Sequence, residues 1–423
     1  MTEPASAPRV APADRAALAE QAIRARSLRR LWALPGTRLG VVAWPPSFGQ
    51  RLFLRWHYWW QAHLLDALVD AQMRAPDDER RATITRFIRG HRLRNGGRWG
   101  NNYYDDIAWW ALALQRADEL AGVPSGAAVS GITSTIVGAW SDLAGGGIPW
   151  RRGDVFRNTP ANGPAAILLA RTGYQDRALA TADWIDQRLR IVGTDLIADG
   201  LVPGEADGEA AVDETVYTYC QGVVLGAELE LAVRAGRDHG RIHRLVTAVG
   251  THLAPGGVLT GHGGGNGGLF TGILARYLAQ IAVRLPDADR QDARTRSAAA
   301  ELVLRSADAA WRGARHGRDG PIFGPDWADP ARQPGRGGTG AVSGNAMVAA
   351  SREPERDLSV QLSGWMLMEA AALIGTGPAR TAGSELPTGS ERTAKSELAA
   401  GPGLRAGSRD AGPTDRFGRQ TDH

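Results

Sequence analysis

Apolar residues recur along most of this chain at a spacing close to 3.6 residues, which is typical of helices that bury one face. The alternation of apolar and polar residues that marks strands is almost absent. Segments dense in Gly and Pro act as turns between the periodic stretches. The pattern predicts an all-α protein with twelve helices, at residues 14–33, 51–74, 77–93, 105–121, 125–141, 161–172, 174–191, 215–235, 237–253, 268–283, 290–315 and 358–375.

The predicted connections are of two kinds. Some are tight, near residues 76, 124, 173 and 236, whereas others run ten residues or more and carry aromatic, amide and acidic side chains. Two helices joined by a short turn form an antiparallel hairpin, and several hairpins can close into a ring. A ring gathers the long loops at one end, where they would build a site. The alternative is an open solenoid, but the chain has no sequence period of that kind, so we expect a ring over residues 13–375.

The two ends of the chain do not fit this pattern. Residues 376–423 lose the apolar periodicity and fill with Gly, Ser, Thr, Pro, Arg and Glu, so we expect a disordered tail. Residues 1–12, rich in Ala and Pro, are expected to form a disordered N-terminus. Residues 317–354 are similarly loop-like, with Phe323 and Trp327 as candidate anchors on the ring.

Composition excludes several classes of protein. Hydrophobic residues at 43% and charged residues at 22% are ordinary for a soluble globular protein, and no apolar run approaches the roughly 18 residues of a membrane span. The single cysteine, Cys220, cannot form an intrachain disulfide. Residues 1–12 lack the features of a secretory signal, so the expected location is cytoplasmic, with association with the envelope or export by another route as alternatives. With no nucleic-acid motif and no His-rich cluster at ligand spacing, we expect a monomer that binds no nucleic acid, metal or cofactor.

A net charge of +4 is dominated by Arg and includes one local cluster, Arg24, Arg26, Arg29 and Arg30. Apolar residues alternate with these arginines up to Trp32. Such a segment can lie on an anionic membrane surface as a basic amphipathic helix. The interpretation that we favour is a domain helix with a solvated basic face.

The stretch Asn101-Asn102-Tyr103-Tyr104-Asp105-Asp106, followed by Ile107-Ala108-Trp109-Trp110, carries the clearest chemical signal. It places two adjacent carboxylates, among amides and aromatics, at the start of a predicted helix. Hydrolysis of a glycosidic bond uses such a pair, one carboxyl as nucleophile and the other as acid/base. The plain alternative is that Asp105 caps the helix and Asp106 occupies its first turn.

Other polar and aromatic groups fall in the long connections. Fourteen tryptophans are many for this length; Trp99 and Trp150 have Gly and polar neighbours that favour a sugar cleft, whereas Trp109 and Trp110 suit packing. Amides and acids near glycines offer the fixed donors and acceptors that hydroxyl recognition uses. Taken singly, Asn158 or Asp199 could be turn formers. The glycine run 263–268 lacks the Lys-Ser/Thr ending of a phosphate loop.

Five segments of the sequence, here called blocks, resemble in this order the glycoside hydrolases of family 76, the α-1,6-mannanases and their transglycosylase relatives. The resemblance covers about residues 50–285. It implies an (α/α)6 barrel with the Asp pair at the floor of a cleft, and a retaining double displacement on α-1,6-mannan. The blocks are Tyr58-Trp59-Trp60-Gln61-Ala62-His63, Asn101–Asp106 with Trp109–Ala113, Gly145–Trp150 with Asn158-Thr159, Tyr217–Gly222, and Gly268–Leu278.

On this basis we assign Asp105 as nucleophile and Asp106 as acid/base, although spacing alone leaves the opposite assignment open. A helix N-terminus lowers the pKa of an Asp on its axis, which suits an ionised nucleophile, and desolvation by aromatics favours a protonated acid. The residues expected to bind substrate are Trp60, Gln61, Asn101, Asn102, Tyr104, Trp150, Asn158, Asp199, Tyr219, Gln221 and Asn266.

Three positions depart from the family pattern, and they motivate alternatives. Cys220 stands where the family usually has Asn, Asn266 lies near a usual Asp, and Thr271 replaces a usual Lys. The alternatives are a transglycosylase on the same glycan, a catalytically silent glycan-binding protein, and a helical scaffold for protein partners. The richness in Ala, Arg and Gly suggests a high-GC bacterial source, where the α-1,6-mannan of envelope lipoglycans is a plausible substrate for an endo-α-1,6-mannanase-like enzyme.

Overall fold

The computed structural model describes residues 10–204, 210–335, 341–342 and 350–376, so most of the predicted N-terminal segment and all but Thr376 of the predicted tail lie outside the described residues. The helices are α1 (Pro12–Arg26), α2 (Phe48–Arg51), α3 (Tyr58–Arg74), α4 (Asp78–Arg94), α5 (Tyr104–Ala121), α6 (Gly126–Val137), α7 (Thr159–Arg171), α8 (Gln175–Leu189), α9 (Thr218–Ala235), α10 (Gly240–His252), α11 (Phe270–Arg284), α12 (Arg290–Gly313) and α13 (Leu358–Gly375). All twelve predicted helices are present, and the four-residue α2 is additional.

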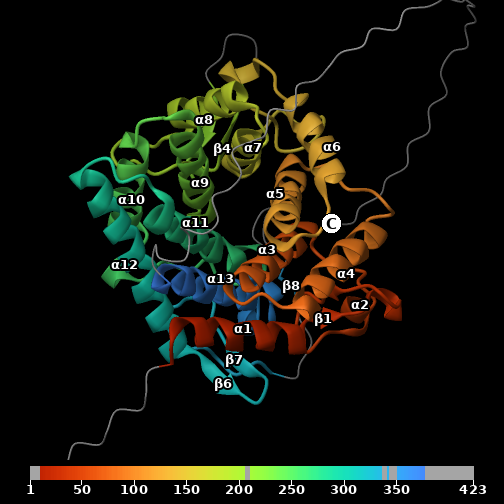
Figure 1. The fold of residues 1–423 in the computed structure, drawn as a ribbon. Helices are drawn as coiled ribbons and strands as arrows, with labels where there is room; N and C mark the ends of the chain where they lie inside the picture. The colour runs from red at the N-terminus through yellow and green to blue at the C-terminus, as the bar shows by residue number, and fades with distance from the viewer. Residues whose placement is uncertain (1–9, 205–209, 336–340, 343–349, 377–423) are drawn as a thin grey trace, which may run out of the picture. The chain divides into compact units, whose positions relative to one another are not determined.

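The helices form two concentric rings (Figure 1). In the inner ring, each of α3, α5, α7, α9, α11 and α13 packs against the next, and α13 packs back against α3. The outer helices α1, α4, α6, α8, α10 and α12 cover this ring from outside. Outer and inner helices alternate along the chain, which makes the fold an (α/α)6 barrel and confirms the predicted closed ring.

The two kinds of connection lie at opposite ends of the barrel. Inner helices are joined to the following outer helices by short turns, at 75–77, 122–125, 172–174, 236–239 and 285–289. Outer helices lead into inner ones through long segments that contain the short antiparallel strands. The strand pairs are β1 (Leu28–Arg29) with β2 (Leu39–Gly40), β4 (Gly200–Val202) with both β3 (Arg157–Asn158) and β5 (Ala211–Asp213), β6 (Arg315–Gly317) with β7 (Gly320–Ile322), and β8 (Ala341–Val342) with β9 (Ala350–Ser351). All inner helices therefore begin at the end that carries the long loops.

A repeated amide contact fixes four of these long loops to the barrel. The fourth residue of α3, α7, α9 and α13 is Gln61, Asn162, Gln221 and Gln361, and each is buried. In each case the side-chain oxygen accepts the N–H of one loop residue, and the side-chain nitrogen donates to the carbonyl of that same residue. For Gln221 the partner is Ile197, at 2.8 and 2.9 Å. A buried side-chain amide that bonds both the N–H and the C=O of one loop residue fixes that residue in the way that a neighbouring β-strand does.

Two predicted helices are wrong by seven residues at one boundary, and the helix predicted to run to residue 141 ends at Val137. The helix predicted to run to residue 33 ends at Arg26, because Leu28–Arg29 pair as β1 with β2. The helix predicted from residue 51 begins at Tyr58, because Phe53 and His57 have positive φ angles of 56° and 46°, which break a right-handed helix. Arg29 and Arg30 therefore lie beyond α1, and the basic cluster is not one amphipathic helix.

Buried charges tie the inner helices together at the end with the short turns. Glu230 on α9 accepts hydrogen bonds from Arg171 at the end of α7 and Arg284 at the end of α11, and also from Arg234. Its side chain is 1% exposed. Burial opposes ionisation of Glu230, but these arginines overcome that effect and hold its pKa far below the ordinary value. One carboxylate thus links three neighbouring inner helices.

The apolar core lies between the two rings and includes Trp110 and Trp365. Phe323 and Trp327 are 2% and 4% exposed, which confirms that they anchor the predicted loop-like segment. Among the described helices, α13 is long and apolar enough to cross a membrane, contrary to the expectation that no segment would be. Its apolar window is 83% buried, as suits an inner helix of the barrel.

Candidate active site

The Asp pair lies in the first turn of the inner helix α5. Tyr103 is the N-cap residue and contributes no side-chain cap, so Asp105 and Asp106 are the second and third helical residues. Asp105 Oδ1 accepts the backbone N–H of Asp106 at 2.7 Å, and its Oδ2 accepts the indole N–H of Trp150 at 2.9 Å. Asp106 Oδ2 accepts a hydrogen bond from the Asn101 amide. The alternative in which Asp105 caps the helix is therefore wrong, because Asp105 lies inside α5; one of its oxygens accepts the N–H of the next residue and the other is bound from a long loop.

The two carboxyl groups have different electrostatic surroundings. Burial raises the pKa of Asp105, and the N–H groups of Asp106 and Trp150 oppose that rise. Burial also raises the pKa of Asp106, the charge of Asp105 raises it further, and the Asn101 amide opposes the rise. Like charges this close do not ionise together easily. The arrangement favours a proton on Asp106 while Asp105 is ionised.

A third carboxyl group, that of Asp199, lies within electrostatic range of Asp105. Its side chain is fully buried, and its Oδ1 lies 3.9 Å from the Cys220 sulfur. No described residue hydrogen-bonds to its Oδ2. Burial raises the pKa of Asp199 to about 7, and the charges of Asp213 and Asp105 act in the same direction. Asp199 therefore has a buried oxygen without a hydrogen-bond partner among the described residues, and its raised pKa favours the protonated form.

Aromatic rings from three inner helices gather at the same end. The Trp60 indole donates to Oδ1 of Asn266 at 3.1 Å, across 206 residues of sequence, and His57 stacks on Trp60 with ring centroids 4.1 Å apart. Tyr219 stacks on Phe270 at 4.0 Å. Flat aromatic faces next to fixed polar groups suit sugar rings, whose faces are apolar and whose edges carry hydroxyls.

The structure gives three of the predicted substrate-binding residues another role. Gln61 and Gln221 are fully buried, and both polar atoms of each amide are bonded to backbone groups. They anchor loops and present no free group to a ligand. Asn158 is buried as the N-cap of α7, where its Oδ1 accepts the N–H of Ala161. Spacing could not reveal this, since an amide at a helix start is compatible with either role.

The remaining predicted residues lie around the pair. Asn101 and Trp150 contact it directly, whereas Tyr104 is partly buried and joins the loop through its N–H, which donates to the Trp150 carbonyl at 2.9 Å. Asn102 is exposed. Tyr219 lies near enough to Asp105 and Asp199 for their charges to add to burial in raising its pKa.

The three departures from the family pattern are accommodated locally. Thr271 Oγ1 donates to the Thr260 carbonyl at 2.9 Å and lies 3.3 Å from the Thr218 hydroxyl. Asn266 receives the Trp60 indole, and Cys220 is buried against Asp199. None of these contacts involves the Asp105 or Asp106 carboxyl groups.

Two neighbours of the site were missed at the level of sequence. The Nε2 atom of His262 accepts the N–H of Thr218 at 3.2 Å, and its ring meets Tyr217 and Phe270 edge-on. Asp213 lies on β5 and raises the pKa of Asp199. A lone histidine inside the glycine-rich segment 261–268 was the available signal for the first. Asp213 carried no signal, because only the pairing of β4 with β5 brings it near.

The comparisons with known proteins agree with this geometry. The sequence model of glycosyl hydrolase family 76 matches residues 22–353. Among curated proteins, none matches the chain at a significant level. The structure of the GH76A α-1,6-mannanase from Salegentibacter sp. HEL1_6 is similar at a TM-score of 0.70 and 28% identity, covering 86% of this chain and 99% of that one.

Two further structures extend the comparison. An inactive variant of the same mannanase, with two consecutive aspartates replaced by asparagine and α-1,6-mannotriose bound, matches at a TM-score of 0.70 and 27% identity, over 86% of this chain and 99% of that one. Dfg5 from Chaetomium thermophilum, in complex with glucosamine, shares the fold at a TM-score of 0.59 and 15% identity, over 75% of this chain and 81% of that one. The match over most of its length and the conserved barrel establish that the chain belongs to glycoside hydrolase family 76.

Proposed function

We propose that the protein hydrolyses α-1,6-linked mannan by a retaining double displacement, with Asp105 as nucleophile and Asp106 as acid/base. The observation that carries the proposal is the asymmetric pair at the start of α5, in which Trp150 and a backbone N–H donate to Asp105, while burial and the Asp105 charge raise the pKa of Asp106. The similarity to an α-1,6-mannanase that is inactive without two consecutive aspartates supports it.

The proposed mechanism assigns the nucleophile to the carboxyl group that accepts two N–H groups and the acid/base to the one whose pKa is raised further by its neighbour. The Asp105 carboxylate attacks the anomeric carbon and forms a glycosyl ester, while Asp106 donates its proton to the departing glycosidic oxygen. Asp106, now ionised, takes a proton from the incoming water, which attacks the anomeric carbon and releases Asp105. The Asn101 amide orients Asp106 in both steps because it donates to the same carboxyl oxygen.

The proposal is tested with linear α-1,6-mannan and α-1,6-mannotetraose, by following reducing ends and the anomeric configuration of the first product by NMR. We expect turnover with retention. Product of inverted configuration would contradict the double displacement, and absence of turnover by folded wild-type protein would favour the silent glycan-binding alternative.

The two aspartates can be assigned by leaving-group dependence. Asp106→Asn should slow cleavage of mannan by about 10²–10⁴-fold, yet slow release of a nitrophenol from an aryl α-1,6-mannobioside much less, because that leaving group needs no proton. Asp105→Asn should abolish both reactions. The reverse pattern would exchange the two roles.

Transfer and hydrolysis differ only in what resolves the glycosyl ester. Adding excess α-1,6-mannobiose as acceptor and measuring product length separates them, since a transglycosylase yields products longer than the substrate. We propose hydrolysis.

We propose that the substrate includes the lipid-anchored α-1,6-mannan of envelope lipoglycans. We also propose a cytoplasmic location for the protein, which cell fractionation tests.

A further inference from the structure

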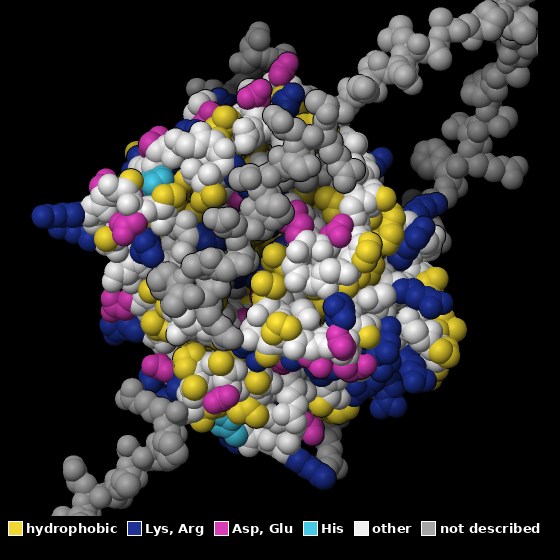
Figure 2. All heavy atoms as spheres, in the orientation of Figure 1, with side chains coloured by type: hydrophobic (Ala, Val, Ile, Leu, Met, Phe, Trp, Pro, Cys, Tyr) yellow, Lys and Arg dark blue, Asp and Glu magenta, His cyan; other side chains and the backbone are white. Residues whose placement is uncertain are grey.

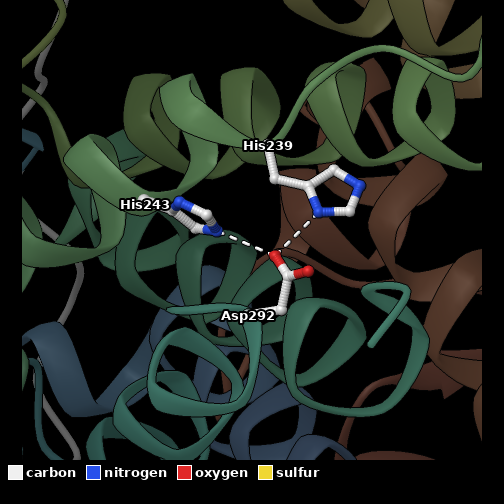
Figure 3. A group of neighbouring side chains, drawn as sticks. All are labelled: His239, His243 and Asp292. Carbon is white, nitrogen blue, oxygen red and sulfur yellow. Dashed lines mark hydrogen bonds and ion pairs between the residues drawn. The ribbon is translucent and has the colours of Figure 1, made fainter. Parts of the chain in front are cut away.

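A cluster of two histidines and one aspartate lies on the outer ring, away from the Asp pair (Figure 3). His239 precedes α10 and His243 lies in its first turn, a spacing of four residues that puts both rings on one side of the helix. Asp292 lies in the first turn of the neighbouring helix α12. Outer helices begin at the end of the barrel with the short turns, so the cluster is at the opposite end from the candidate active site.

The three side chains converge on one carboxylate oxygen. Asp292 Oδ1 lies 2.7 Å from His239 Nδ1 and 2.8 Å from His243 Nε2. The other oxygen, Oδ2, accepts the backbone N–H groups of Ala288 and Asp289 at 3.0 and 3.3 Å. The backbone thus fixes the carboxylate and directs its Oδ1 toward the histidines, as the outer contacts of a metal ligand commonly do.

We propose that His239, His243 and Asp292 form a binding site for a divalent transition metal, with zinc as the cation that the ligands fit best. Two imidazoles and one carboxylate, with a position left for water, are a common zinc ligand set. The donor atoms lie within 4.8 Å of one another. With zinc bonds of about 2.0–2.2 Å, a bound ion would replace the two hydrogen bonds to Asp292 Oδ1, so that each histidine nitrogen moves slightly away from Oδ1 and the two nitrogens move toward one another.

Access and local charge are compatible with a cation. His243 and Gln291 line a surface groove of about 330 Å³ beside the cluster. Of the arginines on α10, Arg241 is paired with Asp183, Asp186 and Glu228, and Arg244, which lines the same groove, lies 4.0 Å from Asp195. A bound metal would clip α10 to α12, so its effect should be on stability and not on catalysis.

The test uses the full chain, stripped with chelator and titrated with Zn²⁺ by calorimetry, together with thermal unfolding with and without Zn²⁺. We expect one Zn²⁺ per chain and a rise in melting temperature. His243→Gln, which leaves the Asp292 cap in place, should lose both effects, whereas His252→Gln on the same helix should keep them.

Two results would overturn the proposal. One is wild-type protein that binds no Zn²⁺ or gains no stability from it. The other is His243→Gln that binds Zn²⁺ as tightly as His252→Gln, which would place the metal elsewhere. In either case the cluster would be a hydrogen-bonded clamp between the two helices.

A second inference concerns the segment between α1 and α3, and it rests on separate observations. Residues 21–65 contain seven arginines and no acidic residue. Large apolar side chains in this segment are exposed, with Phe48 at 78%, Leu54 at 67% and Trp32 at 49%. Figure 2 shows basic side chains gathered where Figure 1 places α2, β1 and α4.

Contacts within the segment join these residues into one surface. The Trp32 indole donates to the Leu52 carbonyl at 2.8 Å, and Arg94 at the end of α4 donates to the Phe53 carbonyl at 2.7 Å. Arg38 is near enough to Arg30 and Arg86 for their charges to interact, and Glu79 on α4 is also within range of Arg38. Among the described residues, no acidic group pairs with the exposed Arg30, Arg51, Arg55 or Arg89.

We infer that this surface, formed by Trp32, Phe48 and Leu54 with Arg30, Arg51 and Arg55, binds an anionic lipid surface. Unpaired arginines around exposed apolar side chains match the charge of acidic headgroups and the apolar boundary beneath them. The segment leads directly into α3, at the barrel end that carries the candidate active site. The idea that this surface brings the enzyme to lipid-anchored mannan rests on the proposed function, whereas the inference of lipid binding does not.

Sedimentation with vesicles tests this surface without any substrate. We expect binding to vesicles of phosphatidylglycerol and phosphatidylcholine that weakens with salt, and little binding to phosphatidylcholine alone. The double variants Phe48→Ser with Leu54→Ser, and Arg51→Glu with Arg55→Glu, should each lower partitioning about tenfold or more. Val192→Ser, which alters a side chain that is 98% exposed elsewhere, is the matched control.

Activity on soluble mannan should be unchanged in the Phe48 and Leu54 variant, so failure of lipid binding and failure of the proposed hydrolysis are distinguishable. Equal binding to neutral vesicles, or no binding to either kind, would overturn the inference. So would concentration-dependent dimerisation that Phe48→Ser abolishes, since the surface would then belong to a second copy of the chain.

Discussion

Replacing Trp150 by Phe removes one hydrogen bond from the proposed nucleophile and leaves an aromatic ring in place. The indole N–H donates to Asp105 Oδ2 at 2.9 Å, and the charge of the carboxylate strengthens that bond. Phenylalanine cannot donate. The substitution therefore acts on the ionised form of Asp105 more than on its protonated form.

The sign and size of the effect follow from this. A hydrogen bond to a charged group contributes about 1.5–3 kcal/mol, and one pKa unit corresponds to about 1.4 kcal/mol. The N–H of Asp106 still donates to the other oxygen of Asp105, so we take the lower end of this energy range. We therefore expect the lower of the two apparent pKa values of the Asp105–Asp106 pair to rise by about one unit. The acid limb of kcat/KM should move to higher pH by that amount.

The assay is kcat/KM for α-1,6-mannotetraose as a function of pH, which reports ionisation in the free enzyme. At a pH on the wild-type acid limb, the variant should be about tenfold slower, with a smaller difference on the plateau. Trp184→Phe is the control, because its indole N–H donates at 3.0 Å to the Ala144 carbonyl and not to a carboxylate. An acid limb that stays in place or moves to lower pH in folded Trp150→Phe would refute the reasoning.

Three further predictions concern stability and binding. Glu230→Gln should lower the free energy of unfolding by about 3 kcal/mol in urea titration, because it removes a buried carboxylate that pairs with three arginines. Glu301→Gln, in an exposed pair, should change the free energy of unfolding by less than about 1 kcal/mol. Since the folded-state pKa of Glu230 is depressed, its contribution is present above the unfolded pKa and is lost as pH falls, so the difference between wild type and variant should shrink in acid. Gln221→Leu should lower the free energy of unfolding by about 3 kcal/mol or more in the same titration, because three backbone groups lose their hydrogen-bond partner. The control Gln115→Leu should lower it much less, because Oε1 of Gln115 has no described partner. Equal losses in the two variants would contradict the loop-anchoring role of Gln221. Asp199→Asn should raise KM for mannotetraose about 10–100-fold with little change in melting temperature, and an unchanged KM would exclude contact between Asp199 and the sugar.

The barrel could be predicted from the sequence because its signals are local. Apolar spacing located the twelve helices, and the lengths of the connections showed which end would carry the long loops. The pattern failed at Phe53 and His57, where the apolar periodicity continues although the backbone adopts positive φ angles. Periodicity reports which side chains are apolar, whereas helix boundaries depend on backbone conformations that tertiary contacts select.

The candidate site, too, was only partly predictable from the sequence. The position of Asp105 and Asp106 at a helix start was visible in the sequence. That Gln221 holds Ile197 was not, because an amide beside glycines fits a sugar as well as a loop carbonyl. The sequence analysis found no histidine cluster at ligand spacing, which is wrong: His239 and His243 are four residues apart, but their common partner Asp292 lies about fifty residues away on another helix.

By itself, then, the sequence determined the helical class, the alternation of short and long loops, and the adjacent carboxyl groups at the start of an inner helix. Only the tertiary structure decided which amides are anchors, which carboxyl group receives the Trp150 indole, and that Trp60 meets Asn266. The physical reason is that propensity and periodicity act over a few residues, whereas burial and hydrogen-bond partners depend on how the six hairpins close on one another. That closure gives two identical neighbouring side chains, Asp105 and Asp106, different environments and hence different proposed roles.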